Sequence, residues 1–558
     1  MNSLFVAGIA VFLLILGYIF YSRKVKEWVG LDDNEVPPSV SMNDGVDYVP
    51  AKHWTILFGH HFASIAGAAP IIGPVIACLY WGWLPAIIWI VVGGVLFGAV
   101  HDFTALVLSL KHKGKSITTV AESVMGKMGK ILFSGFAFLT LILVVAVFAA
   151  VAGKTLATTP EVVIPTFGLI VVALIVGILI YRMQLPVLLC SIIGLLLLVG
   201  LIVAGYYVPI RLPLENEENV ASLWTVVLLI YGMIASVTPV TLLLQPRDHL
   251  AGSVLYLGML FGFLGIIITR PDMKAPSVIS FSTDKGWMWP MLLVTIACGA
   301  ISGFHSLVAS GTTSKQVPRM KDARVIGYGG MIMECVLAVM ATIAVTAGLY
   351  WKSAPSGSEG LVYQELFKGG NWIKAFGTGY GQLTKVIFGG LGMLIGITML
   401  KTFVMTSLDT ATRIARYISN ELFGETFGIP YMKNKYTATI LVGILAGALA
   451  LGNWKAIWPV FGAANQLIAS LVLIVASVYL ITRNRSFLFT AVPAVIMLLT
   501  TIGALVYNTY CFVTAEKPNV LLATIDVILI VLAIFLAYTA LVTVAKARKN
   551  LTGNPQED

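Results

Sequence analysis

Charged residues are scarce in this chain: Asp, Glu, Lys and Arg make up 11% of its 558 residues, whereas 58% are hydrophobic. A soluble protein of this length cannot bury so much apolar surface inside ordinary domains. The mean hydropathy of +0.91 points the same way. The scarcity of charge therefore excludes a conventional soluble protein and predicts an all-α polytopic membrane protein.

Other absences narrow the chemistry. The five cysteines include no Cys-x-x-Cys pair and lie in or near apolar runs, so we expect packing residues rather than disulfides or a structural zinc site. The sequence has no His-Glu-x-x-His motif, no other His/Cys cluster at ligand spacing and no P-loop. These absences argue against a metalloenzyme and an ATP-driven pump, and they predict no cofactor and no bound metal.

Long apolar runs recur along the whole chain, and a helix needs about 20 apolar residues to cross a bilayer. The runs cover residues 4–20, 54–80, 84–110, 130–156, 162–181, 186–208, 223–245, 250–269, 288–312, 326–350, 382–412, 436–452, 457–482, 487–512 and 519–545. They predict about 15 transmembrane helices. Basic residues follow the first run instead of preceding it, so residues 1–25 are expected to be an anchor helix rather than a cleaved signal peptide.

Basic residues cluster in alternate loops between these runs, as in "SRKVKEW", "KHKGK" and "SKQVPRMKDAR". Cytoplasmic loops of membrane proteins carry an excess of Lys and Arg. The alternation predicts an N-terminus outside the cell and a cytoplasmic C-terminal tail at 547–558. It also explains the formal net charge of +10 without a nucleic-acid partner. Membrane lipid is the partner that the composition predicts.

Helix-breaking residues interrupt two of the predicted spans. The span at 54–80 contains "IAGAAPIIGP", with Gly67 and Pro70 near its middle, and the span at 223–245 contains Gly232 and Pro239. Unwound backbone in a membrane survives only where it lines a cavity, and half-helix ends there can bind ions. A simple proline kink is the alternative for each break taken alone.

The two breaks lie five spans apart in helices of opposite direction, which is typical of an inverted-repeat transporter with a site at the bilayer midplane. The expected units are the anchor at 1–25, a first repeat at 53–208, a second at 222–424, accessory spans at 435–546 and the tail at 547–558. The substrate-binding candidates around the breaks are His60, His61, Ala66, Gly67, Pro70, Ser236 and Thr238.

Several polar residues stand where lipid would disfavour them. The candidates for a proton or coupling-ion site are His101, Asp102, His305, Ser306, Ser310, Thr312, Thr313, Glu334 and Asp409. Histidine titrates near neutral pH and suits proton coupling, whereas neutral hydroxyl clusters suit sodium. Each candidate also has a purely structural alternative. Asp102 could pair locally, the hydroxyls could bond to their own helix, and the residues around Asp409 could form an amphipathic extension of the span at 382–412.

Two further pairs have local explanations. Asp409 and Arg413 are four residues apart on one predicted helix and could pair. Asn465 and Gln466 are expected to bind adjacent helices. Glu334 is isolated in its apolar run, so it needs a partner or a proton.

Six separated motifs resemble the carbon starvation protein A (CstA) family: "GHHFASIAGAAPIIGPVIA", "GAVHDF", "QPRDHL", "ACGAISGFHSLVASGTTSK", "GYGGMIMEC" and "WPVFGAANQLIA". The resemblance implies a transporter of the bacterial inner membrane, induced when carbon runs short, with a leucine-transporter-type 5+5 inverted-repeat core and two broken helices. Uptake of peptides and proton-coupled import of pyruvate are associated with the family. The motif positions that it marks here are His60, His61, His101, Asp102, Arg247, Asp248, His305 and the Asp409–Arg413 pair.

The favoured hypothesis is an ion-coupled secondary transporter that imports peptides, small carboxylates such as pyruvate, or both, with H⁺ or Na⁺ as the coupling ion. The alternative is an intramembrane metal-dependent enzyme or sensor, with a metal at His60, His61, His101 or His305. Peptide against pyruvate, proton against sodium, and the oligomeric state stay open at this stage.

Overall fold

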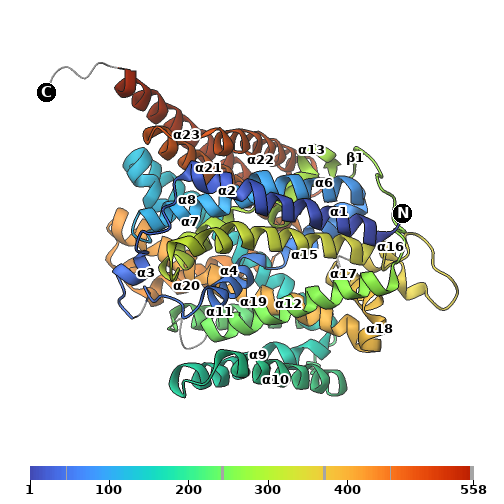
Figure 1. Ribbon diagram of the computed structural model, residues 1–558. Coiled ribbons are helices and arrows are strands. Elements are labelled where there is room, and N and C mark those ends of the chain that lie inside the picture. Colours follow the sequence, from blue (N-terminus) through green and yellow to red (C-terminus); the bar gives the residue numbers. More distant parts are fainter. Residues whose placement is uncertain (46, 240–243, 369–371, 453, 553–558) are drawn as a thin grey trace.

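The computed structural model describes residues 1–45, 47–239, 244–368, 372–452 and 454–552, and nearly all of them are helical (Figure 1). Within these residues the only strands are β1 (Ser282–Thr283) and β2 (Gly286–Trp287), which form one short antiparallel hairpin. The prediction of an all-α chain is therefore confirmed. The spanning segments are helical because a helix satisfies its own backbone hydrogen bonds, and lipid offers no partners for these groups.

The first half of the chain contains α1 (Ser3–Leu16), α2 (Ser22–Val29), α3 (Pro38–Ser41), α4 (Trp54–Ala66), α5 (Ala69–Tyr80), α6 (Trp83–Gly93), α7 (Ala99–Lys111), α8 (Ile117–Thr158), α9 (Val163–Gly177), α10 (Val187–Tyr207), α11 (Glu217–Val237) and α12 (Leu244–Thr269). The second half contains α13 (Met288–Ile296), α14 (Gly303–Gly311), α15 (Gly329–Thr346), α16 (Tyr363–Phe367), α17 (Trp372–Leu383), α18 (Lys385–Phe388), α19 (Gly392–Ser419), α20 (Lys435–Ala450), α21 (Trp454–Thr482), α22 (Leu488–Thr514) and α23 (Val520–Thr552).

Thirteen helical stretches in the described residues are long and apolar enough to cross a membrane, or 14 when the bent pair α4–α5 counts as one span. Each predicted run contains a helix, but α20 has 16 residues. At 1.5 Å per residue, a helix of that length is shorter than the ~30 Å hydrocarbon core. The polytopic architecture is confirmed, whereas the count of 15 is not.

The first predicted break is present. The axes of α4 and α5 differ by 42° across Gly67 and Ala68. Gly67 has φ 52° and ψ −151°, a conformation that residues with a side chain avoid. The glycine in "IAGAAP" therefore ends one half-helix, and Pro70 lies in the first turn of the next.

The second predicted break, in the span at 223–245, lies only partly within the described residues. Helix α11 runs without interruption through Gly232 to Val237, so the expectation of a break at Gly232 is wrong. A Cβ on Gly232 would lie 3.3 Å from Oγ1 of Thr412, so this glycine lets α11 pack closely on α19. Pro239 follows the end of α11, and residues 240–243, part of the same predicted span, lie outside the described residues.

The second interruption is in the span from Met288 to Lys315. Helix α13 ends at Ile296, Ala297 has φ 7° and ψ −92°, and α14 begins only at Gly303. The two breaks face one another: a Cβ on Gly73 would lie 2.5 Å from the carbonyl oxygen of Thr295. Close backbone contact at this point therefore depends on glycine.

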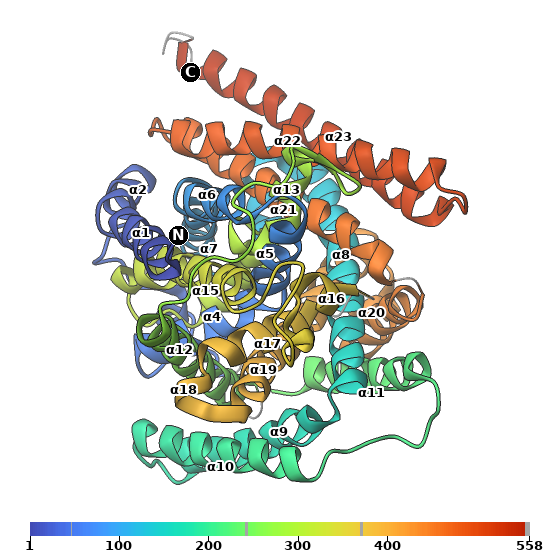
Figure 2. The ribbon, with the colours of Figure 1, turned by 90° about the vertical axis from the view of Figure 1, so that its right-hand side faces the viewer.

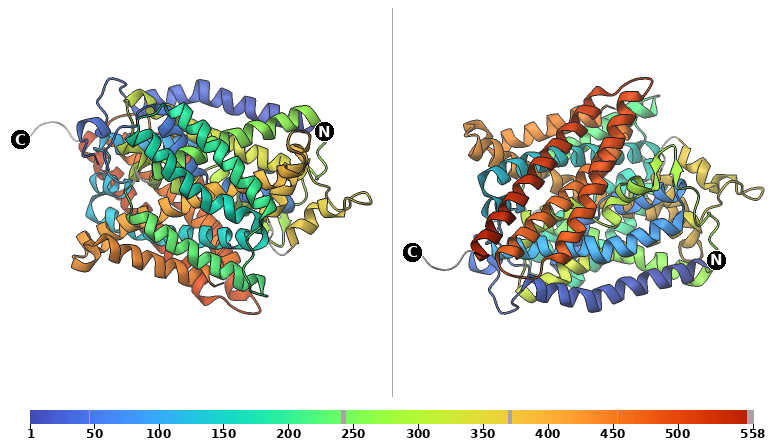
Figure 3. Two further views of the ribbon diagram at one scale, coloured as in Figure 1. Left: turned by 90° about the horizontal axis from the view of Figure 1, so that it is seen from below. Right: turned by 90° about the horizontal axis from the view of Figure 1, so that it is seen from above.

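Helix α8 is the centre of the packing and contacts α11, α19, α20 and α21. Helices α9 and α10 pair with each other along one edge of the bundle, and α22 and α23 lie along the opposite edge (Figures 2 and 3). The start of α1 and the end of α23 lie at opposite ends of the bundle (Figure 1). Most of the buried ionisable residues are carried by the helices between these two edges, whereas the buried Asp526 lies on α23.

Candidate functional site

The ionisable side chains predicted as site residues are buried in the bundle, and most of them join one of two clusters. The histidine–carboxylate chain comprises His101, Asp102, His305 and Glu334. The arginine cluster comprises His60, Tyr231, Arg247, Asp248 and Asp409. Every member except the half-buried Tyr231 has at most 2% of its side chain exposed.

The histidine–carboxylate chain connects α7, α14 and α15. Asp102 on α7 lies between two imidazoles: its Oδ1 is 2.7 Å from Nδ1 of His101, and its Oδ2 is 2.8 Å from Nδ1 of His305. On the other side of the His305 ring, Nε2 is 3.2 Å from Oε2 of Glu334. The partner that the isolated Glu334 requires is therefore His305.

This chain contains polar atoms without hydrogen bonds. In the described part of the chain, no hydrogen-bond partner is present for Nε2 of His101, Nε2 of His305 or either carboxylate oxygen of Glu334. Buried polar atoms are normally satisfied, and exceptions concentrate at functional sites. Because both nitrogens of His305 face carboxylate oxygens, the group has places for a proton on the ring and on Glu334.

The arginine cluster connects α4, α11, α12 and α19. Arg247 on α12 donates from Nη1 to Oδ2 of Asp409 and from Nη2 to Oδ1, the latter over 3.0 Å. Its Nη2 lies 2.5 Å from Oδ1 of the neighbouring Asp248. Oδ2 of Asp248 is in turn 2.8 Å from Nδ1 of His60, and Tyr231 donates to Asp409 over 3.1 Å. Planar, bidentate pairing of this kind is what Arg provides and Lys does not.

The predicted pairing of Asp409 with Arg413 is wrong, because Asp409 accepts from Arg247 instead. The guanidinium of Arg413 donates through Nη2 to the carbonyl oxygens of Ala235 (2.8 Å) and Thr238, at the end of α11. The last carbonyls of a helix lack partners within it. The reading of this stretch as an amphipathic extension is also wrong, since Asp409, Arg413 and Arg416 are all buried.

The side chains of His60 and His61 contact different neighbours. Adjacent side chains on a helix point about 100° apart. His60 joins the arginine cluster, whereas Nδ1 of His61 lies 2.9 Å from Oγ1 of Thr313. A Cβ on Gly330 would lie 3.0 Å from the His61 ring, so α15 packs directly on it.

Most of the predicted hydroxyl cluster is bonded within its own helix. Ser306 donates to the carbonyl of Gly303, Ser310 to that of Ser306, and Thr312 to that of Val308. Such bonds are common for Ser and Thr in membrane helices. Each uses the hydroxyl proton and leaves the oxygen lone pairs free to accept. The structural alternative is satisfied for Ser306, Ser310 and Thr312, and their role in ion binding stays a prediction.

The substrate-binding candidates fall into two groups. Ala66, Gly67 and Pro70 lie at the break between α4 and α5, with Oγ of Ser407 donating to the carbonyl of Ser64 close by. Ser236 and Thr238 lie instead at the end of α11, where Arg413 binds the backbone. Residues 240–243, which continue their predicted span, lie outside the described residues, so the binding role of Ser236 and Thr238 stays a prediction.

Asn465 on α21 holds the second break. Its Oδ1 accepts from the backbone N–H of Phe304 over 2.8 Å, and its Nδ2 donates to Oγ of Ser302 over 2.9 Å. Gln466 donates to the carbonyl of Leu293 over 2.7 Å. The prediction that these amides bind adjacent helices is confirmed.

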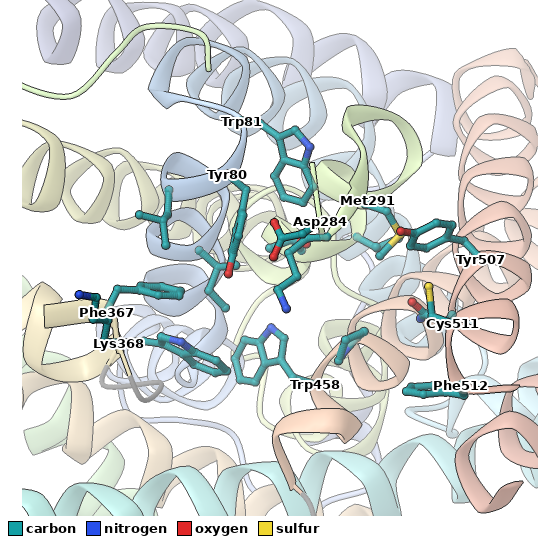
Figure 4. A pocket seen from close by; sticks show the side chains of 18 of the residues that line it. Tyr80, Trp81, Asp284, Met291, Phe367, Lys368, Trp458, Tyr507, Cys511 and Phe512 are labelled. Atoms are coloured by element: carbon teal, nitrogen blue, oxygen red, sulfur yellow. The ribbon is translucent and has the colours of Figure 1, made fainter. Parts of the chain in front are cut away.

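A cavity of about 760 Å³ opens at the end of α5. Figure 4 shows aromatic side chains around it, with Asp284 among them. Its walls come from α5, the β1–β2 hairpin, α13, α16, α17, α21 and α22. They include Tyr80, Trp81, Asp284, Lys285, Phe367, Lys368, Trp372, Trp458 and Tyr507. This size is in the usual range for small-molecule sites.

Sequence reasoning missed several residues. Cys298 lies in the second break, and its Sγ, His305 and Glu334 offer three possible metal-ligand atoms within 4.8 Å of one another. The thiol is also hydrogen-bonded to Asn465 over 3.3 Å. Asp526 on α23 is buried, with neither oxygen hydrogen-bonded in the described residues. Lys401, for which the sequence analysis predicted no role, is buried as well.

Comparison with known proteins gives a consistent result. The chain matches the family described as "Carbon starvation protein CstA" over residues 2–357 and 361–504. It is 32% identical to the pyruvate/proton symporter BtsT of Escherichia coli (strain K12), covering 90% of this chain and 81% of that protein. It is also 32% identical to the peptide transporter CstA of Campylobacter jejuni, with 90% and 79% covered. A solved manganese transporter of Eremococcus coleocola shares the fold, at a TM-score of 0.50 and 10% identity, over 91% of this chain and 99% of that one.

Proposed function

The chain belongs to the carbon starvation protein CstA family, and from this premise we propose that it is an ion-coupled secondary transporter that imports peptides, small carboxylates such as pyruvate, or both. The printed functions of its relatives support both substrate classes. The observation that carries the proposal is the contact between two interrupted spans beside a fully buried chain of ionisable groups. Membrane proteins use such groups for ion and proton pathways.

The coupling ion in this proposal is the proton. His101, Asp102, His305 and Glu334 form a continuous chain of close nitrogen–oxygen contacts, so a proton can pass between neighbouring groups. A relative named as a proton symporter agrees with this choice.

The core is a five-plus-five inverted repeat of the leucine-transporter type, with a revised division. When the hairpin of α9 and α10 is treated as an insertion, the broken spans Trp54–Tyr80 and Met288–Lys315 are five spans apart and opposite in direction. The first repeat is then α4–α5, α6–α7, α8, α11 and α12, and the second begins at α13. The peripheral place of the hairpin and the packing of α8 on α11 and α19 support this division (Figure 2).

The proposed membrane is the bacterial inner membrane. In the proposed orientation the basic loops are cytoplasmic and the N-terminus is outside. The cavity at the end of α5 then opens to the outside. The arginine cluster lies on the cytoplasmic side of Gly67, where it ties α4 to α11, α12 and α19.

Purified protein in proteoliposomes tests the proposal, with labelled pyruvate and a labelled dipeptide offered under an imposed proton or sodium gradient. We expect accumulation of at least one substrate under the proton gradient alone. Failure of both substrates to accumulate under either gradient would overturn the proposal. A stoichiometric metal in that same protein, lost on replacing Cys298 by Ser, would then favour the metal-dependent sensor.

A further inference from the structure

Lys401 on α19 is a buried amine without a carboxylate partner in the described residues. Its side chain is 1% exposed, and its Nζ donates one hydrogen bond, over 2.5 Å, to the carbonyl oxygen of Ala152 on α8. In the described residues no carboxylate oxygen lies within 4.0 Å of it, whereas Arg247 on the neighbouring α12 contacts two carboxylates. An ammonium group has three donors, so the carbonyl satisfies only part of it.

A lone charge at this depth needs a reason. Ionisable side chains inside a membrane are costly, pair with an opposite charge or backbone carbonyls, and mark substrate or ion paths. A second unsatisfied group lies nearby: Thr398, one turn before Lys401 on α19, is buried and its Oγ1 has no hydrogen-bond partner in the described residues. Together the two residues offer donors to something that the protein itself does not supply.

Aromatic side chains connect this position to the cavity. Ala152 lies one turn after Phe148 on α8, and the Phe148 ring would touch a Cβ on Gly67 at 3.0 Å. Phe148 packs edge-on against Phe461 at a centroid distance of 5.8 Å. Phe461 packs on Trp458, which lines the cavity (Figure 4). Lys401 thus lies close to where the aromatic path from the cavity reaches the first break.

We propose that Lys401 binds the carboxylate of the transported substrate, with Thr398 donating a second hydrogen bond. The inference rests on the proposed function, since pyruvate and a peptide C-terminus share this one group. A carboxylate that reaches Lys401 from the cavity pairs with the protonated amine, and charged hydrogen bonds of this kind are the strong ones. Binding therefore selects a free carboxylate over its neutral amide.

The wild-type protein gives the first test. A dipeptide and the same dipeptide with an amidated C-terminus compete against labelled substrate, both for binding to detergent-solubilised protein and for uptake. We expect the acid to compete about 10- to 100-fold better than the amide, the ratio that charge-assisted hydrogen bonds support. Equal competition by the two would overturn the inference whatever the variants do.

Replacing Lys401 by Gln should weaken binding of the acid by a similar factor and leave binding of the amide unchanged. Lys401→Arg should retain part of the preference, and Thr398→Val should reduce it less. Lys435→Gln is the matched control, because Lys435 also donates to a single backbone carbonyl but is exposed. A folded Lys401→Gln protein with an intact preference for the acid would refute carboxylate binding by Lys401 but not the proposed function. Wild-type protein that neither binds nor accumulates either carboxylate would refute the proposed function as well.

Discussion

Nδ1 of His305 lies 2.8 Å from Oδ2 of Asp102, although 203 residues separate the two in the sequence. The contact joins α14, which follows the second break, to the uninterrupted α7. Any movement of α14 relative to α7 therefore changes the environment of a buried imidazole. In the proposed mechanism, substrate movement at the break therefore alters the proton affinity of His305 through this contact.

Glu334→Gln should separate coupling from transport. The amide keeps the shape of the side chain but cannot accept a proton from His305, so we expect substrate exchange to continue while accumulation driven by a proton gradient is lost. In proteoliposomes, counterflow measures substrate exchange, and uptake under an imposed proton gradient measures accumulation. His249→Gln is the control, because His249 is partly buried and its ring contacts Ser191 over 2.7 Å, outside both clusters. Normal proton-driven accumulation by Glu334→Gln would exclude Glu334 from coupling.

Asp409→Asn should destabilise the protein strongly. The change leaves Arg247 buried with one carboxylate fewer, and breaking a buried ion pair on one side costs about 3–5 kcal/mol. Thermal unfolding in detergent measures the loss as a lower Tm. The exposed pair of Lys368 and Glu365, 2.6 Å apart, is the control: Glu365→Gln should cost at most about 1 kcal/mol. Equal effects of the two substitutions would contradict the role of the arginine cluster.

The sequence predicts features that have a local cause and misses those with a distant one. Apolar length and the pair Gly67 and Pro70 act within one helix, so the spans and the first break could be predicted. The partner of Asp409 could not, because Arg413 is close in sequence while Arg247 is 162 residues away. The i, i+4 spacing rule identifies a possible partner on the same helix, but it cannot predict competition from a cation on another helix.

The second break was missed for a related reason. Residues 297–302 are small or apolar and contain no proline, so the stretch resembles part of a continuous apolar helix. What unwinds it is a tertiary contact: Asn465, from α21, takes hydrogen bonds that a regular helix would make internally. Pro239, a strong local signal, only follows the end of α11.

Asn465→Leu should therefore damage the second break. The substitution removes the acceptor for the backbone N–H of Phe304 and the donor to Ser302, and an unsatisfied buried group costs about 1–3 kcal/mol. We expect a lower Tm together with weaker binding of substrate. Thr140→Val is the control, since Thr140 is buried and its hydroxyl has no partner in the described residues. A Tm as high for Asn465→Leu as for Thr140→Val would argue against Asn465 as the support of the break.

Gly67→Ala should abolish transport while the protein still folds. Alanine at φ 52° is strained by about 1–3 kcal/mol, and its Cβ would lie 3.0 Å from the Phe148 ring and 3.1 Å from Oγ of Ser407. The ring can shift by a few tenths of an ångström, so the bundle survives, but the shift disturbs the aromatic path at the break. Gly135→Ala on α8 is the matched control, because its Cβ meets nothing within 4 Å and alanine favours the helix. Uptake and thermal unfolding of both variants decide the matter: loss of Tm without selective loss of uptake in Gly67→Ala would make the break a purely structural kink.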